Sequence, residues 1–255
     1  MSFPSQRADA NDEPESLVLS RSQQAAALDL IASRIESVVA HAAIVRQQEA
    51  TSDLIALSIH TELKRIARLT RAVTLQNKNE VPSRRAVSAG EIAAAARAAC
   101  LAIARLNGLD CIVTLDDAAF TLTGERSLIL LCIAGTVDAL SDLLLANPVY
   151  QGAADEGIPL QLTIALRSMK TRPALFVEIG CTALPIGTGL AVHFFENSDE
   201  DYGRTPAAGI LLAAAAHVVR LHGGRADITR HDGAGVTVTY VFPQDAAPGL
   251  SRDSR

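Results

Sequence analysis

The sequence predicts an α+β protein in which a helical hairpin precedes an α/β sandwich, and three observations support this. First, neither Pro nor Gly interrupts residues 16–75, which are rich in Ala, Leu, Ile, Arg, Glu and Gln, as expected of long helices. Second, a polar segment with a proline follows and reads as a linker over 77–87. Third, helical stretches and short strand-like runs are mixed over 88–243, as in one sheet covered on one face by helices.

Composition narrows the classes of function. Of the 255 residues, 49% are hydrophobic, which is ample for a core, while aromatic residues make up only 4% and Trp is absent. The formal net charge of −5 is spread without a basic block, so a nucleic-acid partner is not expected.

Targeting signals and cysteine spacing both indicate a cytoplasmic protein without membrane insertion. No apolar run reaches the roughly 18 uncharged residues of a membrane helix, and the first residues are polar and acidic, unlike a signal peptide. The four cysteines form no CxxC pair and each lies in an apolar stretch, so reduced, buried thiols are expected: Cys100, Cys111, Cys132 and Cys181. The polar segments 1–15 and 244–255 are expected to be disordered tails.

The first helix of the hairpin has a heptad pattern of apolar residues. They step by three and four residues along the chain: Leu28, Ile31, Ile35, Val38, Ala42 and Val45. The second helix repeats the pattern less strictly, with Ile59, Ile66 and Val73 seven apart. Two helices cannot bury such stripes alone, so we expect the hairpin, residues 16–76, to pair with a second copy as a four-helix bundle in a homodimer. The alternative is that the hairpin packs on the rest of its own chain.

The second domain, residues 88–243, begins with capping-box spacing between Ser88 and Glu91. His222-Gly223-Gly224 ends its last helix with a glycine stop, and an Asp-Gly turn at 232–233 joins the last two strands. The pattern predicts helices at 88–106, 125–145 and 207–221, and strands at 111–117, 120–122, 160–169, 174–180, 226–229 and 236–242.

Residues 88–243 resemble the catalytic and ATP-binding domain of bacterial sensor histidine kinases, whose fold is shared with gyrase and Hsp90. Residues 207–243 look like the second glycine box, its helix, the His-Gly-Gly turn and the last hairpin of that family. Residues 124–144 resemble the helix that bears its Asn, 176–182 the Asp-x-Gly-x-Gly strand, and 193–209 the nucleotide lid. The hairpin resembles the family's dimerisation and phosphoacceptor domain. The resemblance therefore implies an α/β sandwich of the histidine kinase ATPase type.

The resemblance also assigns an ATP pocket, in which several residues are replaced. Glu178 takes the place of the adenine-reading Asp, with Gly180 retained and Thr182 in place of the second glycine. Asp138 stands at the position of the magnesium-binding Asn. In the second glycine box Gly209 matches, but Leu211 would fill the space that a phosphate needs. We therefore expect no cofactor, with ATP and magnesium bound only if the pocket is still functional.

The phosphoacceptor histidine of the family is missing from its best-matching place. Ser33 and Arg34 stand there, and neither can carry an acid-labile phosphate as imidazole does. His41, two turns along the helix, is either a displaced phosphoacceptor or an ordinary surface histidine. No pair of histidines has a metal-ligand spacing with a carboxylate nearby, so zinc is not expected.

The sequence therefore favours a degenerate, histidine-kinase-like dimer that binds receiver domains or partner kinases without autophosphorylation. The expected partner-binding face is charged and lies on the bundle flank: Arg34, Glu36, Lys64 and Arg68, with Arg65 and Arg71 nearby. One alternative is a histidine phosphotransferase, or an active soluble histidine kinase, using His41. Another is an anti-sigma-factor-like regulator, although such proteins lack the hairpin.

Overall fold

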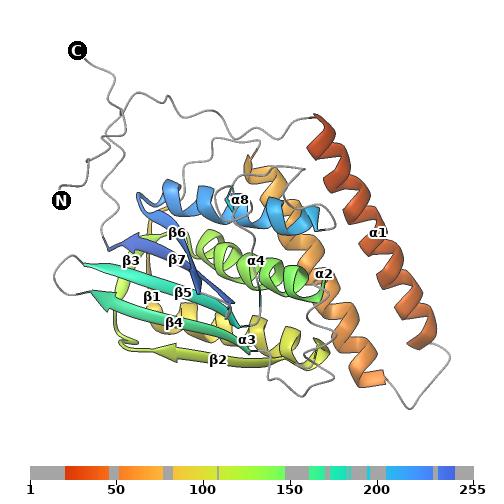
Figure 1. Cartoon of the computed structure of the whole chain (residues 1–255), viewed down its shortest axis with the longest axis horizontal. Helices are drawn as coiled ribbons and strands as arrows, with labels where there is room; N and C mark the ends of the chain where they lie inside the picture. The colour runs from red at the N-terminus through yellow and green to blue at the C-terminus, as the bar shows by residue number, and fades with distance from the viewer. Residues whose placement is uncertain are drawn as a thin grey trace, which may run out of the picture.

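The computed structural model describes residues 21–45, 52–76, 83–107, 109–146, 161–169, 173–182, 184, 194–195, 205–231 and 235–244. Two 25-residue helices, α1 (Arg21–Val45) and α2 (Ser52–Gln76), lie side by side as a hairpin. In the described part of the chain they are followed by a mixed sheet and by the helices α3, α4 and α8 (Figure 1). This α+β architecture confirms the predicted fold class.

The sheet has five strands in the order β2-β4-β5-β7-β6. β2 runs parallel to β4, and every other neighbouring pair is antiparallel. The strands span the following residues: β2 (Asp110–Leu115), β4 (Gln161–Met169), β5 (Ala174–Thr182), β6 (Arg225–His231) and β7 (Gly235–Pro243). A separate antiparallel pair joins β1 (Arg85–Ser88) to β3 (Thr121–Gly124).

One face of the five-stranded sheet is buried, because alternate residues of its central strands are apolar. In β5, Leu175, Val177 and Ile179 are all fully buried. Phe176 and Glu178, which lie between them in the sequence, are partly exposed. The buried face is covered by three helices: α3 (Ala89–Asn107), α4 (Arg126–Leu145) and α8 (Pro206–Leu221) (Figure 1). The sandwich is therefore two layers thick, one of sheet and one of helices.

Two predicted helix ends are confirmed in atomic detail. At the start of α3 the Glu91 N–H donates to Ser88 Oγ at 3.2 Å, and the Ser88 N–H donates to Glu91 Oε2 at 3.2 Å, which completes the capping box. α8 ends at Leu221, and Gly223 follows with a φ of 71° that favours glycine, while the Gly224 N–H donates to the Val219 carbonyl at 2.9 Å.

The helical hairpin packs on its own chain. α2 lies against α4 and α8, while α1 contacts α2 and the edge of α8 (Figure 1). Ala27 of α1 and Leu69, Ala72 and Leu75 of α2 are buried in the same core as the sandwich. This is the alternative arrangement considered for the hairpin, and it leaves only part of its apolar surface free.

Three further observations differ from the sequence-based expectations or complete them. β1 was not predicted, and its first three residues fall in the segment assigned to the linker. Among the described helices, α4 alone is long and apolar enough to cross a membrane, but 72% of the apolar window is buried inside the fold, as in a core helix. The Asp-Gly turn at 232–233 lies outside the described residues.

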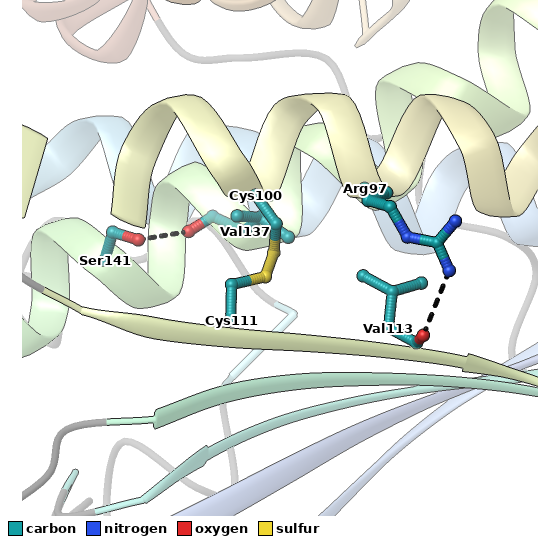
Figure 2. The surroundings of a disulfide bond; sticks show 6 residues. All are labelled: Arg97, Cys100, Cys111, Val113, Val137 and Ser141. Atoms are coloured by element: carbon teal, nitrogen blue, oxygen red, sulfur yellow. Dashed lines mark hydrogen bonds between the residues drawn. A yellow bond between two sulfur atoms is a disulfide. The ribbon is translucent and has the colours of Figure 1, made fainter. Parts of the chain in front are cut away.

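The expectation that all four cysteines are reduced is wrong for one pair. Cys100 of α3 and Cys111 of β2 form a disulfide, with Cα atoms 6.0 Å apart, where the helix lies over the edge strand (Figure 2). Cys132 and Cys181 are free and buried, as expected. The pairing was missed because the two cysteines meet only after the chain reverses from helix to strand.

Candidate functional site

Six charged side chains meet where the hairpin packs on the sandwich. Arg34 comes from α1, and three come from α2: Glu62, Arg65 and Arg68. Asp138 and Asp142 come from α4, one helical turn apart. We call this group the arginine–carboxylate cluster. Its three positive and three negative groups balance in number, as partly buried charges require.

Asp138 is the most deeply buried member of the cluster, with a side chain that is 0% exposed. Arg68 binds both of its oxygens: Nε lies 2.6 Å from Oδ2 and Nη2 lies 3.0 Å from Oδ1. Arg65 Nε is 3.8 Å from Oδ1. A two-point contact of this kind is the strongest that a guanidinium makes with a carboxylate.

Asp142 connects the cluster to both hairpin helices. Arg34 Nη2 donates to its Oδ2 at 3.2 Å, and Arg65 Nη2 donates to its Oδ1. Glu62 holds the same two arginines on the hairpin side, with Arg34 Nη1 at 2.7 Å from Oε2 and Arg65 Nη1 at 3.1 Å from Oε1. The hairpin and the sandwich therefore share one continuous network.

Burial and charge act in opposite directions within the cluster. Burial raises the pKa of Asp138 above its ordinary value, and the charges of Arg68 and Arg65 oppose that rise. Burial lowers the pKa of Arg65, but the carboxylates of Asp142, Asp138 and Glu62 outweigh it, and the net shift is upward. Arg65 is therefore charged at any pH at which the protein is folded.

The second glycine box contributes packing to the space between α4 and α8. Gly209 lies buried in the first turns of α8. Leu211 is 5% exposed, and a methyl group placed on Gly135 of α4 would lie 3.5 Å from its Cδ2. Leu211 therefore packs directly against α4 at Gly135, where the absence of a side chain allows the two helices to lie close together.

Glu178 and Gly180 lie on the open face of the sheet, not among the helices. Alternation along β5 places Glu178 opposite to Ile179 and Cys181, which are buried in the core. Glu178 Oε2 pairs instead with Arg167 Nη2 of β4 at 3.3 Å. A methyl group placed on Gly180 would meet Thr163 Oγ1 of the same open face at 2.6 Å. The structure does not bring Glu178 together with Asp138.

The inner face beside α4 is filled by other side chains. Tyr240 of β7 is fully buried, and its hydroxyl is 2.6 Å from Thr136 Oγ1 of α4. Phe195 lies against Tyr240 with ring centroids 6.3 Å apart, and Phe194 packs edge-on against Phe195. These aromatic contacts occupy the layer between sheet and helix.

The residues predicted for partner binding differ in their exposure to solvent. Glu36 and Lys64 are exposed, as expected. Arg34 and Arg68 are only 19% and 16% exposed, which corrects their expected exposure, because α4 supplies carboxylates to both. The side chain of His41 lies outside the described residues, although its backbone belongs to α1. In the described ranges, no group of three His, Cys, Asp or Glu residues could hold a metal ion.

Comparison with known proteins identifies the fold. No family model and no curated protein matches the sequence. Among solved structures, the catalytic domain of histidine kinase ThkA superimposes with a TM-score of 0.51 and 16% identity, covering 64% of this chain and 97% of that chain. The chain has the fold of a histidine kinase core.

Two longer structures extend the likeness to the hairpin. ThkA in complex with the response regulator TrrA matches with a TM-score of 0.51 and 13% identity over 89% of this chain and 62% of that chain. Full-length ShkA in complex with AMPPNP matches with a TM-score of 0.55 and 11% identity over 89% of this chain and 47% of that chain. At these identities the likeness establishes the histidine-kinase-like fold alone.

The residues matched to nucleotide contacts do not fit a magnesium–nucleotide complex. The Asp138 carboxylate is already neutralised by Arg68 at two points. Leu211 packs on α4, and Glu178 lies on the other face of the sheet. A nucleotide held by Asp138 would have to displace a paired guanidinium and expose a buried charge. The orientation of Glu178 could have been predicted from the sequence. Leu175, Val177, Ile179 and Cys181 alternate along the strand, so Glu178 must face the opposite side of the sheet.

Proposed function

We propose that this chain is a degenerate histidine-kinase-like protein of a two-component system, which binds a receiver domain or a partner kinase and does not phosphorylate itself. The observation that supports the proposal is the state of Asp138, buried and held at both oxygens by Arg68. A metal ligand must present free lone pairs to the cation, and here a guanidinium occupies them. Without a magnesium–nucleotide complex the chain has no phosphoryl donor of its own.

The fold supports the two-component part of the proposal. The TrrA complex of ThkA shows that a protein of this fold docks a response regulator. In this chain, Glu36 on α1 and Lys64 on α2 remain exposed and lie on the hairpin. We assign the docking face to this exposed flank, since the arginines of the cluster are occupied within the molecule.

The proposed assembly is a homodimer through the hairpin. Among the hairpin side chains that the structure describes, four large apolar ones remain exposed: Leu28, Ile35 and Val39 of α1, at 62%, 47% and 63%, and Leu63 of α2 at 51%. Arg34 and Glu62 are in contact, so Ile35 and Leu63, each the next residue along its helix, lie on the same side of the hairpin. Such a stripe is costly in water and is buried when two hairpins pair.

Two incubations test the proposal. In one, the protein is mixed with labelled ATP and magnesium; in the other, it is mixed with a receiver domain that carries the labelled phosphoryl group. We expect no label from ATP and a direct, stoichiometric complex with the receiver domain. Acid-labile label from ATP that His41→Ala abolishes would show a kinase instead. Label received only from the receiver domain, and lost in the same variant, would show a histidine phosphotransferase. A complex with a sigma factor and none with a receiver would favour an anti-sigma-like regulator.

A further inference from the structure

α4 carries two carboxylates on a helix that is otherwise strongly apolar. Between Arg126 and Leu145, Asp138 and Asp142 are the only acidic residues, and Arg126 is the only basic one. The two carboxylates lie one turn apart, and burial raises the pKa of Asp138, with a smaller contribution in the same direction from the charge of Asp142. Two neighbouring negative charges on an apolar core helix are stable only when positively charged side chains pair with them.

The cations come from the hairpin and from no other described element. Arg65 and Arg68 are three residues apart on α2, so they project from the same face toward α4. Arg68 forms an ion pair with Asp138, while Arg65 forms ion pairs with both Asp138 and Asp142. Arg34 adds a contact from α1, and Glu62 fixes the orientation of two of the guanidiniums. The spacing on α2 matches the spacing on α4.

We propose that Arg65 and Arg68 form an electrostatic latch, which holds the hairpin closed on the sandwich and fills the cation position at Asp138 with guanidinium groups. Opening the hairpin would expose two carboxylates on an apolar helix and would unpair the arginines at the same time. The closed arrangement is therefore maintained by the cluster as a unit and not by single contacts. This inference rests on the geometry of the six side chains and does not depend on the proposed function.

The latch also determines which part of the hairpin can meet a partner. With Arg34, Arg65 and Arg68 turned inward, the exposed side chains of the described part of the hairpin include the apolar stripe, Glu36 and Lys64. A closed hairpin would present one fixed surface to a partner.

The competing explanation is that packing alone holds the hairpin. Leu69, Ala72 and Leu75 of α2 are all buried against the sandwich, and their contacts contribute to the same interface. A double-mutant cycle separates the two explanations, because it isolates the energy that Arg68 and Asp138 share.

Hydrogen–deuterium exchange of the full-length chain measures the opening of the hairpin. The set is wild type, Arg68→Ala, Asp138→Ala, the double variant, and Lys64→Ala as a matched control on the exposed side of α2. Arg68→Ala is expected to speed exchange of α2 amides by about tenfold or more, while β5 and β7 stay protected. The double variant is expected to exchange about as fast as Arg68→Ala and not at the product of the two single effects, because both substitutions remove the same contact.

Two results would overturn the latch. One is exchange in Arg68→Ala that equals that of Lys64→Ala. The other is a double variant whose rate is the product of the single effects. If Arg68→Ala does not fold, Arg68→Lys replaces it, since it keeps the charge but loses the two-point contact. The measurement contains no nucleotide and no partner, so failure of the latch and failure of the proposed function are distinguishable.

Discussion

The Arg68 guanidinium binds both oxygens of the Asp138 carboxylate, at 2.6 Å and 3.0 Å, across the boundary between hairpin and sandwich. Arg68→Ala would leave a buried carboxylate with only the more distant Arg65 as a counter-charge. We expect the variant to lose about 3–5 kcal/mol of unfolding free energy in urea titrations at neutral pH. Lys64→Ala, on the exposed side of the same helix, should change it by no more than about 0.5 kcal/mol. Equal stability of the two variants would argue against the ion pair.

The apolar stripe of the hairpin gives the second prediction. Ile35→Glu combined with Leu63→Glu places charges on two exposed side chains on the same side of the hairpin. We expect light scattering to give a dimer for the wild type and a monomer for this variant, with unchanged circular dichroism. Met169→Glu, an exposed apolar side chain on β4, is the control and should remain dimeric. A monomeric wild type would exclude the proposed assembly.

The third prediction concerns pH and His222. Its Nε2 accepts the Glu125 N–H at 3.0 Å while Nδ1 lies 2.8 Å from the Val218 carbonyl, so the folded protein requires the neutral ring. Burial lowers the pKa of His222 below its ordinary 6.5. The unfolded state therefore binds more protons in the window below about pH 6.5, and stability falls as pH decreases through it.

His222→Gln tests this account, because glutamine can accept the same N–H without titrating. Its stability should be flatter than that of the wild type between about pH 7 and 5. His231→Gln, on an exposed histidine, is the matched control for replacing a histidine by glutamine. If the unfolding free energy of wild type and of His222→Gln depended on pH in the same way, a group other than His222 would be responsible for the loss of stability in acid.

The fourth prediction concerns the disulfide between Cys100 and Cys111, which are eleven residues apart. Closing a loop of this size stabilises the oxidised protein by about 3 kcal/mol. We expect dithiothreitol to lower the unfolding free energy of the wild type by this amount and to leave that of Cys100→Ala/Cys111→Ala unchanged. Alkylation of unreduced, denatured protein should label two thiols, Cys132 and Cys181. Labelling of all four would contradict the pairing.

Local patterns in the sequence predicted most elements of the fold. The uninterrupted stretch over 16–75 gave both hairpin helices, and the His222-Gly223-Gly224 stop and the capping box gave two helix ends correctly. β1 was missed because a four-residue strand among polar residues has too little alternation to stand out from a linker.

The candidate site was less predictable, since its geometry depends on contacts between distant segments. Asp138 and Arg68 are 70 residues apart, and nothing local pairs them. The hairpin was expected to meet a second copy, so Arg68 was assigned to an exposed flank. A partial signal was present: two acidic residues four apart on an apolar helix require cations, and Arg65 and Arg68 have a matching spacing.

The most direct test of the central claim is calorimetric titration of the wild-type protein with AMP-PNP and magnesium. Arg68 occupies the Asp138 carboxylate and Leu211 packs against α4, so we predict no heat beyond dilution up to millimolar nucleotide. Saturable binding at micromolar concentration that requires magnesium and disappears in Asp138→Asn would contradict the account.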